Sequence, residues 1–137
     1  MRTLLSIALL AVLGGCEHWP DKAEVRRGVE SDAFRQLQAS VPSVALVSGQ
    51  TTCLSVGDNE GPGNAAAVPD SATFRLMRSV GLRKLCINNE SRSVDYIWQI
   101  DWEDQTGVYH PAPGASVGYL GDKTEEWENG LIYYSTF

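Results

Sequence analysis

Residues 94–102 read VDYIWQIDW and carry the clearest secondary-structure signal in this chain of 137 residues. Successive side chains of a β-strand point to opposite faces of the sheet, so a half-buried strand alternates apolar and polar residues. The stretch alternates in this way, and its apolar row is Val94, Tyr96, Trp98, Ile100 and Trp102. It therefore predicts a strand with its aromatic side chains on one face.

Shorter strand signals surround this stretch on both sides. Ser48-Gly49-Gln50 is typical of a hairpin turn, and turn-forming residues recur between the other apolar runs. The expected strands lie at residues 44–46, 53–55, 73–77, 83–87, 94–102, 106–109, 115–120 and 131–134. About seven or eight short strands with such turns predict a mainly β domain, a small antiparallel β-sandwich or barrel.

Before the β-rich part, apolar residues recur at steps of three and four, which is helical periodicity. These residues are Val25, Val29, Ala33, Phe34 and Leu37. Gly28 weakens the signal, because glycine inside a helix costs about 1 kcal/mol relative to alanine. We expect a tether over residues 16–40 with a short amphipathic helix near 22–38, followed by a β-rich domain over 41–137.

The N-terminal residues have the pattern of an export signal. Arg2 precedes an almost wholly apolar run over residues 4–13. This run is too short to cross a bilayer, which takes about 20 residues, but it suits a signal-peptide core. Leu13-Gly14-Gly15-Cys16 then resembles a bacterial lipobox, whose cysteine is lipidated and becomes the mature N-terminus. The alternative is an ordinary secretory signal followed by a chance cysteine.

The lipobox resemblance implies that residues 1–15 are removed and that acyl chains on Cys16 anchor the protein to a membrane. Each buried CH₂ group of such chains contributes about 0.8 kcal/mol, so several chains hold a domain without a spanning helix. Glu17 stands where aspartate retains enteric lipoproteins at the inner membrane. The resemblance therefore favours the outer membrane of a bacterial cell envelope, with the domain facing the periplasm.

Cys53 and Cys86 are the two cysteines that remain. Outside the cytoplasm disulfides persist, and two cysteines have only one intramolecular pairing. The bond would close a loop of about 34 residues and stabilise the fold by roughly 3–4 kcal/mol. The alternative is a pair of buried free thiols.

Charge is distributed unevenly along the chain, whose net charge is −6. Residues 71–94 contain five cations against Glu90 alone, whereas residues 95–137 contain eight acids against Lys123 alone. Nucleic-acid binding needs a basic face, so this balance argues against it. The asymmetry favours a basic protein partner that docks on the C-terminal third.

Aromatic residues share this acidic third, and acidic rims around aromatic anchors are typical of protein–protein hot spots. The candidate partner-binding residues are Asp101, Trp102, Glu103, Asp104, Tyr109, Tyr119 and Trp127. The alternative is that the aromatic residues fill the core while the acids only solubilise the surface.

The sequence offers no catalytic, cofactor-binding or metal-binding constellation that we consider convincing. Residues 114–118 match the G-x-S-x-G nucleophile motif, but no histidine follows them and a full hydrolase sheet needs a longer chain. His18 and His110 lack the spacing of zinc ligands. The carboxylates near 101–104 and 125–128 are so closely spaced that we expect water to solvate them. The general acid of a glycosidase must instead be desolvated, so that its pKa is raised. We therefore expect no enzyme, no cofactor and no metal.

The layout resembles the periplasmic lipoproteins assigned as type VI secretion immunity proteins. The resemblance covers the lipobox, a cysteine shortly after the turn at 48–50, the second cysteine, the Tyr-rich strand and the stretch 108–134. It implies a β-sandwich that binds and blocks a toxin delivered into the periplasm. A second resemblance is to membrane-bound lysozyme inhibitors, through residues 115–119 (ASVGY) and the Trp127 that follows.

Together these observations predict a lipid-anchored periplasmic binding protein. It would block a basic toxin or a lysozyme-like cell-wall hydrolase by steric occlusion. The alternative is a structural lipoprotein of an envelope assembly or secretion machine, with partners from its own cell.

Overall fold

The structure, a computed structural model, describes residues 18–56, 65–66, 70–101 and 103–136. The strands within these residues are β1 Thr51–Ser55, β2 Ala65–Ala66, β3 Lys84–Asn88, β4 Val94–Ile100, β5 Gln105–His110, β6 Lys123–Glu126 and β7 Ile132–Ser135. They form one sheet in the order β2-β1-β3-β4-β5-β7-β6. Neighbouring strands are antiparallel except β1 and β2, which are parallel.

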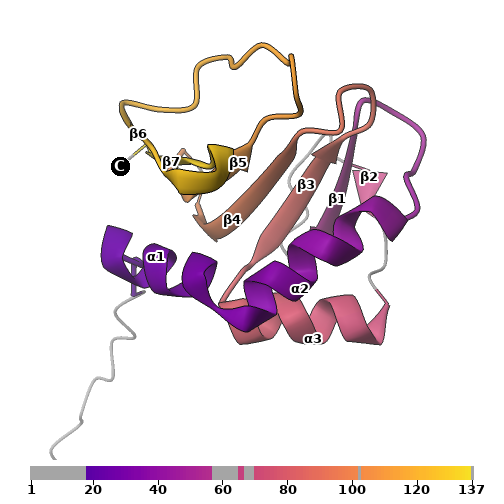
Figure 1. Ribbon diagram of the computed structural model, residues 1–137, viewed down its shortest axis with the longest axis horizontal. Coiled ribbons are helices and arrows are strands. Elements are labelled where there is room, and N and C mark those ends of the chain that lie inside the picture. Colours follow the sequence, from indigo (N-terminus) through magenta and orange to yellow (C-terminus); the bar gives the residue numbers. More distant parts are fainter. Residues whose placement is uncertain (1–17, 57–64, 67–69, 102, 137) are drawn as a thin grey trace, which may run out of the picture.

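Three helices lie against one face of this sheet (Figure 1): α1 Lys22–Glu30, α2 Asp32–Ser40 and α3 Ser71–Val80. Two short 3₁₀ helices cover Val41–Ser43 and Glu128–Gly130. The core fills the space between the helices and the sheet. Its buried members include Val25, Phe34, Leu37, Leu54, Met77, Leu85, Ile87, Tyr96, Trp98 and Val108.

The mainly β, antiparallel class with one disulfide and an N-terminal helical segment is confirmed. Within that class the sheet is open, and helices take the place of the second sheet of a sandwich. Amphipathic helices bury their apolar stripe against a sheet as effectively as a second sheet does. Within the part of the chain that the structure describes, no helix is long and apolar enough to cross a bilayer.

The helix expected near residues 22–38 is two helices that meet at Ser31. Asp21 and Glu24 form a capping box at the start of α1, with the Glu24 N–H donating to Asp21 Oδ1 at 2.8 Å. Ser31 ends α1 and begins α2, because its Oγ accepts the Phe34 N–H at 3.2 Å. Local capping therefore bends the chain so that both helices pack on the sheet.

Gly28 has a packing role that its helix propensity does not indicate. A Cβ atom at this position would lie 2.8 Å from Trp98 Cζ2 and 3.1 Å from the Val80 carbonyl oxygen. Only a residue without a Cβ lets α1 approach the Trp98 ring this closely. The glycine therefore weakens the helix locally while permitting its contact with the sheet.

The strand expected at residues 73–77 is wrong, because these residues belong to α3. The Asp70 side chain caps this helix by accepting the Thr73 N–H at 2.7 Å. Gly81 ends the helix with φ of +90°, a left-handed conformation that suits glycine. The buried side chains of α3 recur at helical spacing, at Thr73, Met77 and Val80. A short apolar run does not distinguish this spacing from a buried strand.

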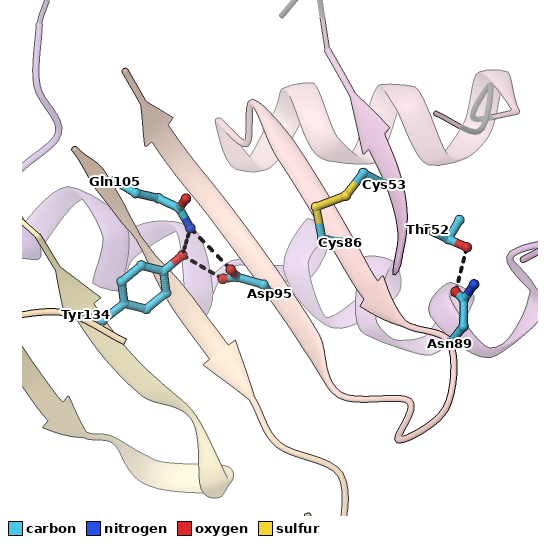
Figure 2. Close-up of a disulfide and its surroundings, with 7 residues drawn as sticks. All are labelled: Thr52, Cys53, Cys86, Asn89, Asp95, Gln105 and Tyr134. Atoms are coloured by element: carbon cyan, nitrogen blue, oxygen red, sulfur yellow. Dashed lines mark hydrogen bonds between the residues drawn. A yellow bond between two sulfur atoms is a disulfide. The ribbon is translucent and has the colours of Figure 1, made fainter. Parts of the chain in front are cut away.

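The hairpin expected around residues 48–50 is also wrong. Residues 44–46 lie outside any strand, and β1 pairs with β3 and β2. Side chains hold the loop instead, since Asn89 Nδ2 donates to the Val47 oxygen at 2.8 Å. The Thr52 hydroxyl in turn donates to Asn89 Oδ1 at 2.7 Å (Figure 2).

Residues 115–120 form a loop and not the expected strand. Gly114 and Gly121 bracket the segment, and both have positive φ values that interrupt an extended run. The side of β7 facing away from β5 is already occupied by β6. The loop therefore has no place beside β7 in the sheet.

Candidate functional site

The face of the sheet opposite the helices, here called the second face, carries the disulfide. Cys53 and Cys86 lie directly opposite each other in the register of β1 and β3, with their Cα atoms 4.1 Å apart. Their sulfur atoms are bonded, which confirms the predicted disulfide (Figure 2). The bond therefore crosslinks two adjacent strands near one edge of the sheet.

A polar cluster that the sequence analysis missed lies beside the disulfide on the second face. Asp95 of β4 stands opposite Cys86 in the register. The Tyr134 hydroxyl donates to Asp95 Oδ1 at 2.7 Å, and Gln105 Nε2 donates to Asp95 Oδ2 at 3.2 Å (Figure 2). Gln105 also contacts the Tyr134 hydroxyl. The cluster joins β4, β5 and β7 through side chains.

The pKa of Asp95 in this cluster differs from that of an ordinary surface carboxylate. Burial raises the pKa of Asp95 to about 6, against the opposing effects of Tyr134, Gln105 and the Lys84 charge. Burial also raises the pKa of the Tyr134 phenol, with the Asp95 charge adding to the effect. Both Asp95 oxygens accept hydrogen bonds from the protein itself, so the arrangement is that of a structural link. The only sequence signal was an acid on the polar row of residues 94–102.

A tight acidic turn connects β4 to β5. The Asp101 N–H donates to the Asp104 carbonyl oxygen at 2.8 Å, which closes the turn. Asp101 and Glu103 are exposed and Asp104 is half-buried. Trp102, which the sequence predicted as an anchor here, lies outside the described residues.

Tyr119 is the most exposed large apolar residue among those that the structure describes. It is 82% exposed, and Val117 of the same loop is 45% exposed. The Tyr119 hydroxyl donates to Asp122 Oδ1, and this bond raises the pKa of the phenol. The loop borders a groove of about 360 Å³ whose other walls are Thr124, Glu126 and Ile132.

The acidic turn and the Tyr119 loop meet at Thr136. The Thr136 hydroxyl lies 3.4 Å from Asp104 Oδ1 and accepts the Gln105 N–H at 2.7 Å. A Cβ atom on Gly121 would lie 3.2 Å from Thr136 Cγ2, so the loop passes directly over this residue. We call these two neighbouring segments together the acidic end, which comprises Asp101, Glu103 and Asp104 of the turn and Tyr119 and Asp122 of the loop.

Two other predicted partner-binding residues lie away from the acidic end. Trp127 follows the far end of β6, where its ring stacks on Tyr133 with centroids 5.2 Å apart. The Arg26 guanidinium lies 4.3 Å from the Trp127 centroid, so this ring serves the contact between α1 and the sheet. Tyr109 is half-buried on the second face, opposite Asp95 in the register. The candidate partner-binding residues that the structure describes therefore lie in three places: the acidic end, the stack of Trp127 on Tyr133, and the second face at Tyr109.

Glu125 also lies apart from the acidic end. Lys22 Nζ approaches Glu125 Oε2 at 2.7 Å, and Arg26 approaches its other oxygen at 3.6 Å. The hydrogen bond from Lys22 lowers the pKa of Glu125. Glu125 is therefore paired with two cations of α1, although its position in the sequence placed it among the acids of the C-terminal third.

The residues considered for catalysis and metal binding are dispersed. His18 Nε2 lies 2.8 Å from Glu24 at the start of α1. Residues 114–118 lie in neither a helix nor a strand, so they lack the strand–turn–helix that a nucleophile elbow requires. Over the described ranges, no group of three or more His, Cys, Asp and Glu side chains could hold a metal ion. Cys16 and the predicted signal peptide lie outside these ranges.

No family model, curated protein or solved structure matches this chain. The resemblances to type VI secretion immunity lipoproteins and to lysozyme inhibitors therefore stay predictions.

Proposed function

We propose that this protein is a lipid-anchored periplasmic binding protein that blocks a basic toxin or cell-wall hydrolase by steric occlusion. The observation that carries the proposal is the acidic end, where the loop with exposed Tyr119 and its partner Asp122 meets the acidic turn at Thr136. Exposed tyrosines are among the residues that most often anchor protein–protein interfaces. Carboxylates at the rim steer a basic partner toward the anchor.

The anchoring part of the proposal depends on Cys16. Trp19 Nε1 donates to Thr106 Oγ1 at 3.0 Å, so residue 19 is tied to the start of β5. Three residues extend at most about 11 Å. A lipid on Cys16 would therefore hold this end of the sheet close to the membrane surface. Replacement by Cys16→Ser should abolish incorporation of labelled palmitate and move the protein to the soluble periplasmic fraction; retention in the membrane fraction would contradict the anchor.

The first experiment uses residues 17–137 as bait, since the described core lies wholly within them. Periplasmic extracts and the product of the adjacent gene are tested under low-salt and high-salt washes. We expect capture of a basic protein whose enzymatic or toxic activity is lost in the complex. Capture of the cell's own envelope components without loss of activity would instead support the structural-lipoprotein alternative.

Matched charge variants test the role of the acidic end. The test variant combines Asp101→Asn, Glu103→Gln and Asp104→Asn, and the control combines Glu30→Gln, Asp32→Asn and Glu90→Gln, all at exposed positions remote from the acidic end. Both variants change the net charge equally. At low salt we expect the test variant to slow association about tenfold and the control less than about twofold, because local charge governs steering. Equal slowing by both variants would exclude local steering by the acidic turn.

Tyr119→Ala tests the anchor. Loss of a central aromatic anchor weakens binding by about thirtyfold, mainly through faster dissociation. Leu46→Ala, at another exposed apolar position, is the control and should leave affinity unchanged. An unchanged dissociation rate in Tyr119→Ala would remove this residue from the interface.

A further inference from the structure

Strand β6 forms one edge of the sheet, and its backbone geometry shows which groups face outward. The Trp127 N–H donates to the Leu131 carbonyl oxygen at 2.7 Å, and this pair continues the register of β6 with β7. Hydrogen-bonded and non-bonded pairs alternate along an antiparallel ladder. Glu125 is therefore bonded to β7, whereas Thr124 and Glu126 direct their N–H and C=O groups away from β7.

The outward groups lie next to the groove beside Tyr119. The side chains of Thr124 and Glu126 are on the second face, and both line this groove of about 360 Å³. An extended segment that bonds to the edge would therefore place alternate side chains into the groove. Exposed Val117 and Tyr119 supply apolar surface for them. A backbone edge joined to a side-chain pocket is the combination used in recognition by strand addition.

The charges at this edge distinguish between two occupants. Residues 122–128 contain four acids and one lysine, DKTEEWE. Two copies of β6 that paired through their outward groups would oppose Glu125 to Glu125 in one register and Glu126 to Glu126 in another. In the third register Asp122 opposes Glu126, and the Lys123 that faces Glu125 meets an acid already paired with Lys22. Like charges directly opposite each other destabilise a strand pair. Charged edges also suppress indiscriminate pairing, and a basic strand would meet these acids favourably.

We propose that the outer edge of β6 binds an extended basic segment of the partner as an additional strand. The inference deepens the proposed function, on which it rests, by specifying how the partner is held. Backbone hydrogen bonds from Thr124 and Glu126 supply the pairing, and the groove beside Tyr119 accepts alternate side chains. The acidic end supplies the preference for a basic sequence.

A capped hexapeptide of alternating lysine and valine is the first probe, with the corresponding glutamate–valine peptide as its control. Titration of residues 17–137 is followed by backbone amide NMR. We expect the lysine peptide to shift the Thr124 and Glu126 amide signals and the glutamate peptide to leave them unchanged. Absence of binding by the lysine peptide, or shifts confined to the 101–104 turn, would overturn the proposal.

Methylation of the peptide backbone tests strand pairing without changing the protein. Two lysine–valine peptides carry N-methyl groups on every second backbone nitrogen. The first is methylated on the odd-numbered residues and the second on the even-numbered residues, which defines the two frames. Because strand addition uses one edge of the peptide, one frame should weaken binding about tenfold or more, and the other less than about twofold. Equal binding by both methylated peptides would overturn strand addition.

Thr124→Pro is the corresponding protein variant, because proline removes an outward N–H and is tolerated on edge strands. Thr124→Val keeps the N–H and is its matched control. We expect the peptide affinity to fall about tenfold in the proline variant relative to the valine variant. Equal affinities would contradict the outward bond.

These tests separate the binding mode from the proposed function. A captured basic partner that binds Thr124→Pro and Thr124→Val equally would refute strand addition while leaving the inhibitor function in place. Peptide binding at β6 without any captured basic inhibitor target would refute the function while leaving the edge as a strand-binding site.

Discussion

The two faces of the sheet are stabilised by different kinds of interaction. On the helix-covered face, Phe34 packs against Tyr96 with ring centroids 4.8 Å apart, within a continuous apolar core. The second face carries the disulfide, the Asp95 cluster and the buried side chain of Lys84. Close packing and burial stabilise the first face, and covalent and polar links stabilise the second. Substitutions on the two faces should therefore have effects of different size and different dependence on solution conditions.

The largest effect is expected for Phe34→Ala on the helix-covered face. Phe34 is 1% exposed and joins α2 to the sheet, so truncation leaves a cavity and costs about 3–5 kcal/mol of unfolding free energy. Urea unfolding measures the loss, and the same loss should appear at pH 4 and pH 7. Leu46→Ala, an exposed truncation, should cost less than about 0.5 kcal/mol. A loss below about 1 kcal/mol for Phe34→Ala would contradict the packing of α2 on the sheet.

Removing the disulfide should have the next largest effect. The cysteines are 33 positions apart, and opening this loop costs roughly 3–4 kcal/mol through the entropy of the unfolded chain. We expect this loss for the double variant Cys53→Ala, Cys86→Ala, measured by urea unfolding. The original chain in a reducing agent serves as the comparison and should show a similar loss. If reduction caused no loss of unfolding free energy, strand pairing alone would be enough to hold this edge of the sheet.

The smallest effect, and the one that depends on pH, is expected for Asp95→Asn. Because the folded chain holds the Asp95 proton more tightly than the unfolded chain, folding takes up a proton between about pH 4 and pH 6. The contribution of Asp95 to unfolding free energy therefore falls as the pH rises through this window, by up to about 3 kcal/mol.

Asparagine keeps a hydrogen-bond acceptor but does not titrate. The Asp95→Asn variant should therefore gain stability relative to the original chain as the pH rises from 4 to 7. Unfolding free energies of both chains at several pH values measure this gain. Glu103→Gln, at an exposed acid, is the control and should show no such trend. A constant difference between the Asp95→Asn variant and the original chain at all pH values would contradict a half-buried Asp95 with a raised pKa.

Local sequence signals predicted the centre of the sheet better than its surroundings. The alternation predicted over residues 94–102 corresponds to β4, but the strand ends at Ile100 and a register shift between Ile97 and Gln99 breaks the alternation there. The runs at 83–87, 106–109 and 131–134 correspond to β3, β5 and β7. The strand predicted at residues 73–77 was wrong because a short apolar run fits either a strand or a helix, although Asp70 and Gly81 are helix-end signals. The strand expected at residues 115–120 was wrong because Gly114 and Gly121, which bracket it, have positive φ values that interrupt an extended run.

The candidate site was only partly predictable from the sequence. The acidic turn and Tyr119 could be selected as charged and aromatic residues, but their meeting at Thr136 depends on how β5 and β7 pair. The same pairing encloses Asp95 and raises its pKa. Trp127 was selected by residue type alone, and its stacking on Tyr133 beneath Arg26 depends on where α1 packs.

The sequence by itself determined the β-rich class, the pairing of the two cysteines and the helical character of the segment before the sheet. These features follow from periodicity, composition and elimination, all of which are properties of neighbouring residues or of counts. The tertiary structure decided that helices cover one face, that Gly28 fits beneath the Trp98 ring, and that β6 is an edge strand of the described sheet. These features depend on register and packing between distant segments, because burial and pairing are set by residues far apart in the chain.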